Sequence, residues 1–346
     1  MNDKIDFKNI TFKKNIKQEL KEDKEKTLVV YSTTSVNKNN IELNNNNYIY
    51  YSTSEVTKER DRIDSIFKNL NSVEKIITLG GGTAIDIGKY LSNKFGTPTV
   101  AVPTMLSTNA FATNKVALVV DNKVVSLDAV IPTKIFLDKD LLLSSNENNL
   151  YGLVDIFSIH TALNDWSLAV KNNNEVTSKE YDRAKSLLMN AIDYVKSHNV
   201  EEIGNDVEST YYMIGESGLI TNEYGSGKPE SGSEHIFAKA LEKEVNIPHA
   251  VSVTNGIILM IISQSMINNS GKLTEQDKLV IDALKKLNMF ELNLKYDITY
   301  ELIHRVFKNL VPRSDRYSAV NLIYQNEEIK DKVLKIYKEY MKGFIK

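Results

Sequence analysis

Apolar and polar positions alternate along the first half of the chain in a way that predicts strands and helices in turn. Short apolar runs at 27–31, 48–51, 76–79 and 98–102 have the length and composition of buried strands. Apolar residues at helical spacing over 57–70 predict a helix before the third of these runs. Strands that alternate with helices are typical of an α/β domain with a Rossmann-like parallel sheet.

A hairpin and a short closing strand complete this half. Two runs, 115–120 and 123–127, are separated by Asp121 and Asn122, a pair that favours a tight turn. The run 135–137 predicts the last strand.

From about residue 150 onward the pattern changes to helices alone, with apolar residues recurring at three- and four-residue spacing. The predicted helices cover 151–170, 178–196, 207–220, 236–242, 253–266, 275–287, 300–310 and 327–342. We therefore expect two domains, an α/β nucleotide-binding domain at 1–149 and an all-helical domain at 150–346. A cleft between them is the expected place for a ligand.

Three consecutive glycines, Gly80, Gly81 and Gly82, separate the strand at 76–79 from a helix that begins at Thr83. Glycines allow positive φ and close approach, while the free N–H groups and the dipole of a helix start attract phosphate. This turn therefore predicts a phosphate site. A tight strand-to-helix turn without a ligand fits the same residues, because the glycines lack the spacing of the GxGxxG fingerprint.

The composition excludes several classes of function. The 346 residues include 43 basic and 45 acidic side chains, which leaves no broad field for nucleic acid or an anionic membrane. Cysteine is absent from the sequence, so a metal must use His, Asp or Glu. The N-terminal residues are charged, and the most apolar helix candidate, 257–267, is interrupted by Ser263 and Gln264. We therefore expect a soluble, cytoplasmic protein without membrane insertion.

Five histidines limit the remaining chemistry. His235 and His249 both lie beside predicted helix starts, and Asp155 lies near the start of the first long helix. Two imidazoles and one carboxylate suit a divalent metal with an open position for substrate. By periodicity alone, capped or surface histidines are the alternative.

Several motifs together resemble one superfamily and cover most of the chain. In order they are GGGTAIDIGKYL, VPTMLSTNAFAT, the helix of Asp155, KPESGSEHIFAKALE, the Pro248-His249 pair and RSDRY. Their order is similar to that of the dehydroquinate synthase-like superfamily, which includes the iron-containing alcohol dehydrogenases. Within it the chain most resembles glycerol-1-phosphate dehydrogenases and other metal-dependent polyol dehydrogenases.

The resemblance implies an oxidoreductase that uses NAD or NADP and a divalent metal, with zinc, iron and nickel all suited to the ligands. Hydride transfer would interconvert a small polyol, or a polyol phosphate such as glycerol 1-phosphate, and its ketone. The implied metal ligands are Asp155, His235 and His249. The implied cofactor contacts are Gly80, Gly81, Gly82, Thr83, Asp86, Thr104, Ser107 and Thr113, with Lys89 beside Asp86 on the same helix.

A phosphate on the substrate would need cationic donors, and Lys228, Arg313 and Arg316 are the candidates. The alternative for each is a solvated surface charge.

The candidate catalytic positions, Asn109 and Lys115, bear on the choice of substrate. The family commonly has aspartate where Asn109 stands, and an amide cannot act as a base. Because the first strand is followed at 31–34 by Tyr-Ser-Thr-Thr rather than by an acidic residue, NAD and NADP both stay open.

Two other functions are possible on this sequence. Lys115 lies six residues after Asn109, as a lysine does in the sugar-phosphate cyclases of the superfamily, which are lyases that use NAD transiently. Against a cyclase, Ser158 stands where those enzymes have a further lysine, and Asp155 where they have glutamate. The third possibility is a non-catalytic protein that binds a nucleotide or a polyol phosphate. The helical faces of the second half could also serve a homo-oligomer interface.

Overall fold

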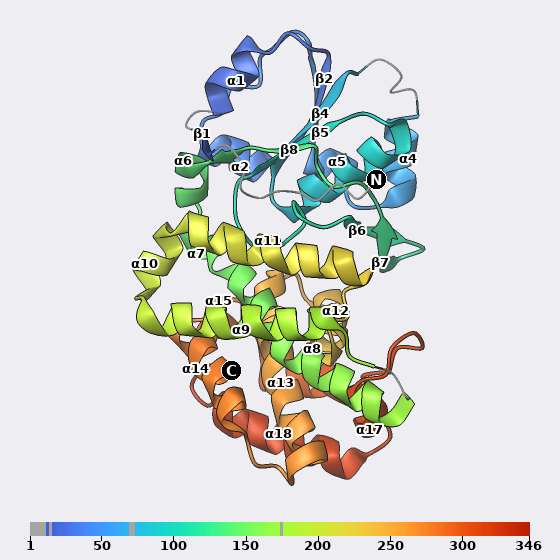
Figure 1. The fold of residues 1–346 in the computed structure, drawn as a ribbon, viewed down its shortest axis with the longest axis vertical. Helices are drawn as coiled ribbons and strands as arrows, with labels where there is room; N and C mark the ends of the chain where they lie inside the picture. The colour runs from blue at the N-terminus through green and yellow to red at the C-terminus, as the bar shows by residue number, and fades with distance from the viewer. Residues whose placement is uncertain (1–11, 14–15, 69–72, 174–175) are drawn as a thin grey trace. The chain divides into compact units, whose positions relative to one another are not determined.

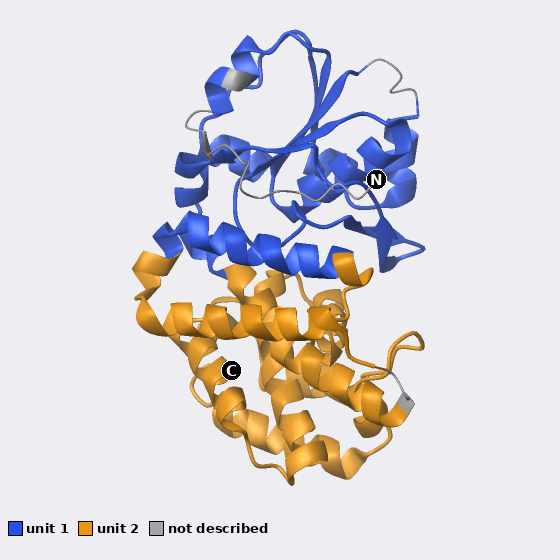
Figure 2. Ribbon diagram, in the orientation of Figure 1, with its two compact units in different colours: residues 1–150, 204–222 blue, residues 151–203, 223–346 orange. Residues whose placement is uncertain are grey.

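The structure is a computed structural model that describes residues 12–13, 16–68, 73–173 and 176–346. The chain forms two compact units (Figure 2). The α/β unit comprises 1–150 and 204–222, and the helical unit comprises 151–203 and 223–346. The domain boundary predicted at 149/150 stays a prediction.

The segment 204–222 groups with the α/β unit because helix α11 (Val207–Tyr224) packs on the chain between β5 (Thr99–Pro103) and β6 (Lys115–Val120). A Cβ atom on Gly218 would lie 2.8 Å from Cβ of Ala112, so the helix approaches this backbone closely. Asn222 adds hydrogen bonds from its Nδ2 to the Ala112 oxygen at 2.9 Å and from the Asn114 N–H to its Oδ1 at 2.8 Å.

A five-stranded parallel sheet forms the centre of the α/β unit (Figure 1), which confirms the predicted fold class. The strand order is β3-β2-β4-β5-β8, so β4, which leads into the glycine turn, lies in the middle. The strands are β2 (Thr27–Tyr31), β3 (Tyr48–Ser52), β4 (Lys75–Gly80), β5 (Thr99–Pro103) and β8 (Lys134–Ile135).

Successive residues of these strands enter cores on opposite faces of the sheet, as the period of a strand requires. Val29 packs with Val36 and Leu141 on one face, whereas Leu28 packs with Ile87 on the other. The helices of this unit, besides α11, are α1 (Ile16–Glu22), α2 (Thr33–Lys38), α3 (Thr53–Val56), α4 (Arg60–Ile66), α5 (Gly82–Phe95), α6 (Lys139–Leu143) and α7 (Asn146–Asn149).

Two predicted elements of the α/β unit are shorter or divided in the structure. The helix expected over 57–70 is the shorter α4, because Thr57 has a positive φ of 58° and the helix ends at Ile66 with Phe67 as its C-cap; residues 69–70 lie outside the described part. The strand expected at 135–137 divides at Phe136 into β8 and β9 (Leu137–Asp138), and β9 pairs with β1 (Phe12–Lys13).

The predicted hairpin is confirmed as β6 (Lys115–Val120) and β7 (Lys123–Asp128) in antiparallel register. Asp121 and Asn122 have φ values of 49° and 59°. Two consecutive positive φ values match the twist of the flanking strands, which is why Asp and Asn suit this turn.

Helices alone form the described part of the helical unit. Helix α13 (His249–Asn269) is long and apolar enough to cross a membrane, but 89% of its apolar window is buried among the other helices. It contacts α8, α12, α14, α17 and α18, so it is the core helix of this unit. The others are α8 (Tyr151–Asn173), α9 (Lys179–Ser197), the first turn of α10 (Val200–Asn205), α12 (Ser233–Glu244), α14 (Glu275–Lys286), α15 (Leu292–Lys295), α16 (Tyr300–Lys308), α17 (Ala319–Ile323) and α18 (Glu327–Tyr340).

Candidate metal centre and nucleotide-binding turn

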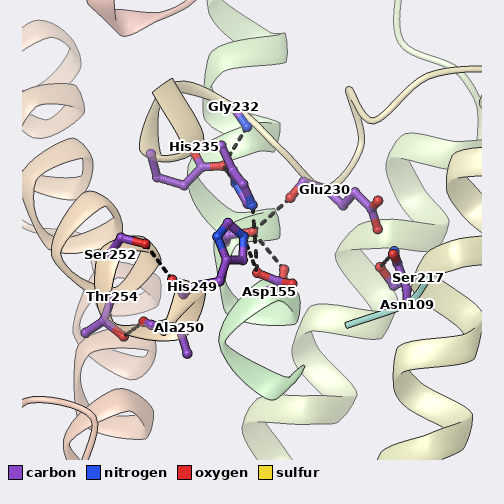
Figure 3. Close-up of polar contacts among 12 residues, drawn as sticks. Asn109, Asp155, Ser217, Glu230, Gly232, His235, His249, Ala250, Ser252 and Thr254 are labelled. Carbon is purple, nitrogen blue, oxygen red and sulfur yellow. Dashed lines mark hydrogen bonds and ion pairs between the residues drawn. The ribbon is translucent and has the colours of Figure 1, made fainter. Parts of the chain in front are cut away.

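Three helix starts of the helical unit bring the predicted metal ligands together (Figure 3). Asp155 lies in the second turn of α8, His235 in the first turn of α12, and His249 is the first residue of α13. Helix α12 contacts both α8 and α13. One ligand atom from each residue lies within 4.8 Å of the other two.

The two imidazoles meet at one carboxylate oxygen. Nε2 of His235 and Nε2 of His249 each lie 3.7 Å from Oδ1 of Asp155. That oxygen is buried and has no hydrogen-bond donor among the described residues. A buried acceptor without a donor costs about 1–3 kcal/mol, and a divalent cation held by these atoms would relieve that cost. The residues present therefore fit a metal.

Each histidine has a second carboxylate on its other ring nitrogen. Nδ1 of His235 lies 2.8 Å from Oε1 of Glu234, and Nδ1 of His249 lies 2.6 Å from Oε1 of Glu242. A carboxylate accepts a hydrogen bond from a protonated Nδ1, and this tautomer leaves the lone pair of Nε2 for a metal. Neither glutamate was among the residues predicted from the sequence, although the seven-residue spacing of His235 and Glu242 places these two residues on one face of α12.

These contacts shift the proton affinities of the groups involved. Burial raises the pKa of Glu242, but the hydrogen bond and charge of His249 outweigh it, so the net pKa is lowered. Burial lowers the pKa of His249, but Glu242 and Asp155 outweigh it and the net pKa is raised. Burial also raises the pKa of Glu234, but hydrogen bonds from His235, Gly232 and Thr161 outweigh it, so the net pKa is lowered.

A buried aspartate fixes the start of α12. Asp165 accepts hydrogen bonds from the N–H of Ser233 at 2.6 Å, the N–H of Ala319 at 2.8 Å and Nε2 of Gln264 at 2.9 Å. Burial and the charge of Glu234 raise the pKa of Asp165 to about 6. Its contacts hold the residues immediately before His235 in place.

The glycine turn joins β4 to α5 in the α/β unit. Gly81 is the N-cap residue of α5, and no side chain caps the N–H groups at the start of this helix. None of the three glycines has a positive φ. Close approach is the reason for them instead, since a Cβ on Gly82 would lie 2.7 Å from Cγ2 of Thr108, and one on Gly80 would lie 3.0 Å from Cβ of Ala84. Helix α5, fourteen residues long, can therefore present its first N–H groups to a phosphate.

The structure gives protein partners to several predicted cofactor contacts. Asp86 is buried and accepts a 2.8 Å bond from Nζ of Lys58, and the hydroxyl of Thr104 shares a 2.8 Å hydrogen bond with that of Ser35. The hydroxyl of Thr113 accepts a hydrogen bond from the N–H of Lys115 at 3.2 Å. Thr83 lies in the first turn of α5, and Ser107 lies between Thr104 and Thr113.

The two candidate catalytic residues lie in the same unit. Nδ2 of Asn109 donates to the Ser217 hydroxyl at 3.3 Å (Figure 3). The Lys115 ammonium forms an ion pair with Asp128 across the hairpin.

The candidate phosphate donors all belong to the helical unit. Arg313 forms an ion pair with Asp315, with its Nε 2.8 Å from Oδ1. The guanidinium of Arg316 donates to the backbone oxygen of Ser231, and Nζ of Lys228 lies 5.3 Å from the ring centre of Trp166.

Lys239 is a further cation that the sequence analysis missed. It lies one turn after His235 on α12, is half-buried, and has no ion-pair partner among the described residues. Burial lowers its pKa, and the positive charges of Arg313 and Arg316 lower it further. Its i+4 spacing from His235 was the available signal.

Comparisons with known proteins agree with these features. The family model described as iron-containing alcohol dehydrogenase matches residues 16–145. The chain is 33% identical over 224 residues to a glycerol-1-phosphate dehydrogenase [NAD(P)+] of Methanococcus vannielii, covering 63% of this chain and 64% of that one. It is 27% identical over 281 residues to one of Pyrococcus abyssi, covering 80% and 79%. The chain thus spans under two thirds of several curated relatives it matches, such as the Methanococcus aeolicus protein, of which it covers 60%.

Solved structures share the fold. Maleylacetate reductase from Agrobacterium tumefaciens has a TM-score of 0.63 at 11% identity, with 96% of each chain covered. Glycerol dehydrogenase from Schizosaccharomyces pombe has a TM-score of 0.59 at 15% identity, covering 92% of this chain and 84% of that one.

Proposed function

The chain belongs to the superfamily of dehydroquinate synthase-like proteins and iron-containing alcohol dehydrogenases, and on that premise we propose that it is a metal-dependent, NAD(P)-linked dehydrogenase. Its substrate is a small polyol phosphate such as glycerol 1-phosphate, which it interconverts with the ketone. The observation that carries the proposal is the convergence of His235 and His249 on the unpartnered oxygen of Asp155.

Asp155, His235 and His249 hold the divalent metal in this proposal, with zinc the first choice and iron or nickel also suited. When bound, the metal supplies Lewis acidity that polarises a carbonyl or hydroxyl oxygen. Glu234 and Glu242 orient the two imidazoles so that both Nε2 atoms face Asp155. Three protein ligands leave coordination positions for the substrate.

The cofactor is assigned to the α/β unit. The uncapped N–H groups at the start of α5 hold the pyrophosphate, and Thr104, Ser107 and Thr113 line the nicotinamide side. Ser32, which follows β2, caps α2 with its hydroxyl at 3.4 Å from the Ser35 N–H and brings no carboxylate to the ribose. Both NAD and NADP therefore remain within the proposal.

The substrate phosphate is assigned to cations of the helical unit. The proposed donors are Lys228, Arg313 and Arg316, to which we add Lys239 because its ammonium has no ion-pair partner in the described part of the chain. Positive charges held near one another favour a multiply charged anion. The matched relatives named glycerol-1-phosphate dehydrogenase support a phosphorylated substrate.

A dehydrogenase is favoured over a cyclase by the side chains at two positions. Lys115 is engaged by Asp128, and Ser158 donates to the backbone oxygens of Asp155 and Glu230 at 2.7 and 2.8 Å. Neither presents a free amine. We also propose a cytoplasmic location, in keeping with the burial of α13.

A spectrophotometric assay tests the proposal. Zinc-loaded protein is mixed with NADH or NADPH and either dihydroxyacetone phosphate or dihydroxyacetone, and the reduced-nicotinamide absorbance is followed. We expect the absorbance to fall with the phosphorylated ketone and to stay constant once a chelator is added. Phosphate release from a sugar phosphate with catalytic NAD and no net oxidation would contradict the proposal and support a cyclase.

A further inference from the structure

Lys89 is a fully buried cation on α5, about two helical turns after Gly82. Its Nζ donates to the backbone oxygen of Ala110 at 2.8 Å and to that of Lys115 at 2.6 Å. Burial lowers the pKa of Lys89 to about 8, while the charge of Asp86 acts in the opposite direction. A buried ammonium is costly unless it is paired, so these two carbonyl groups determine where it can lie.

The two carbonyl groups bracket the last part of the segment 104–114, which links β5 to β6 and carries the proposed nicotinamide contacts. Within this segment, the N–H groups of Ala112 and Thr113 donate to the backbone oxygen of Asn109 at 2.8 and 3.2 Å. Lys89 therefore holds a turn that runs from Asn109 to Thr113.

The same helix begins at the glycine turn, so Lys89 connects two parts of one site. Lys89 belongs to α5, whose first residues carry the proposed phosphate-binding N–H groups. Its ammonium reaches the segment on which the nicotinamide contacts lie. Asn222 of α11 binds that segment independently at Ala112 and Asn114, so loss of Lys89 should loosen the segment without releasing it.

We propose that Lys89 is a positioning residue that holds residues 110–115 against α5 and thereby keeps the phosphate-binding turn and the nicotinamide contacts in register for one dinucleotide. It acts through the two carbonyl groups and does not touch the cofactor. The anchoring of the segment stands on the structure alone, whereas the effect on a dinucleotide rests on the proposed function.

Hydrogen exchange in the cofactor-free protein tests the anchoring. The variants are Lys89→Met, which keeps the buried stem, and Lys89→Gln, which is neutral but can still donate to one carbonyl. Lys94→Met on the same helix is the matched control, because Lys94 is partly exposed and pairs with Asp64. Lys89→Met removes both hydrogen bonds from the ammonium to the segment, so we expect exchange in peptides spanning 109–116 to rise roughly tenfold in this variant.

The remaining outcomes decide the inference. We expect Lys89→Gln to give a smaller increase and Lys94→Met to match the wild type. Unchanged exchange over 109–116 in folded Lys89→Met would overturn the proposal, and if that variant fails to fold, unchanged exchange in Lys89→Gln would do so. Should the wild type bind neither NADH nor NADPH, the proposed function fails while the exchange result still decides the anchoring.

Fluorescence titration with NADH and NADPH tests the effect on the cofactor. We expect a roughly tenfold higher Kd in Lys89→Met with unchanged zinc content, because the variant leaves the metal ligands alone. A higher Kd in Lys89→Met, together with hydrogen exchange over 109–116 equal to that of the wild type, would mean that Lys89 contacts the dinucleotide directly. That result would contradict a positioning role.

Discussion

Nδ1 of His249 lies 2.6 Å from Oε1 of Glu242, across the turn between α12 and α13. Ser252 donates to the same carboxylate oxygen from the first turn of α13. Glu242 therefore ties the end of α12 to the start of α13 and fixes the tautomer of His249 in which Nε2 faces Asp155.

Loss of that carboxylate should weaken the metal centre. We expect Glu242→Ala to reduce zinc affinity by about 10- to 100-fold, because the imidazole loses the acceptor that orients it. Competition with a fluorescent chelator measures the affinity. Glu244→Ala, two residues along the same helix and paired with the exposed Arg305, is the control and should bind zinc as the wild type does. Equal affinities in both variants would contradict the assigned role.

Removal of a histidine tests the ligands themselves. His235→Ala or His249→Ala should abolish metal retention and turnover and leave the chain folded, since each ring would contribute one of the three proposed protein ligands. Metal analysis after dialysis and circular dichroism give the two readouts. His198→Ala is the control, because His198 lies at the end of α9 and bonds the Tyr194 oxygen at 3.0 Å. Full zinc content in both ligand variants would exclude this metal centre.

The glycine turn allows a pair of variants that differ mainly in charge. A Cβ on Gly81 would lie 3.5 Å from Sδ of Met105, which is an ordinary contact, and its φ of −81° suits any residue. Gly81→Ala should therefore fold with modest loss of cofactor affinity. Gly81→Asp places a carboxylate beside the proposed pyrophosphate, and we expect the KM for the cofactor to rise at least about tenfold more than the KM for the ketone. Equal changes in both constants would count against the turn as the phosphate site.

Lys89 also predicts a dependence of stability on pH. Its pKa is about 8 in the folded chain and near the ordinary 10.5 when unfolded, so between these values the unfolded chain binds more protons. Stability attributable to Lys89 therefore rises with pH, by about 2 kcal/mol from pH 7 to 9.5. In urea unfolding, the free energy of unfolding of the wild type should therefore increase relative to that of Lys89→Met between pH 7 and 9.5. The difference between wild type and Lys94→Met should stay constant, and a constant difference for Lys89→Met would show that Lys89 titrates normally.

Local patterns predicted most of the fold because its strands, helices and one turn are determined by neighbouring residues. The positive φ values of Asp121 and Asn122 follow from the residue types, and the strand and helix around the glycine turn follow from their periodicity. The shortening of α4 did not follow, because Thr57 adopts a positive φ that its side chain does not favour.

The site was less accessible to sequence reasoning because its geometry depends on contacts between distant segments. Periodicity left His235 and His249 open between metal ligands and surface residues, and only the order of several motifs selected among these possibilities. The partner of Lys89 at residue 115 lies 26 positions away, and that contact involves a backbone oxygen, which carries no signal in the sequence. The spacing of Glu242 from His235 places both on one face of α12, but the contact of Glu242 with His249 depends on the meeting of α12 and α13.

Lys239 has no ion-pair partner among the described residues, and its proposed role at the substrate phosphate predicts a different effect on phosphorylated and unphosphorylated substrates. Lys239→Met keeps the aliphatic stem and removes the positive charge, which lies near those of Arg313 and Arg316. We therefore expect the KM for dihydroxyacetone phosphate to rise about tenfold. The rate with dihydroxyacetone should change little, because that ketone carries no phosphate. Lys243→Met, one turn further along α12 and exposed, is the matched control and should leave both substrates unaffected. A parallel loss with both ketones would place Lys239 in the reaction itself or in the support of α12, and a wild-type KM for the phosphate would remove it from the anion site.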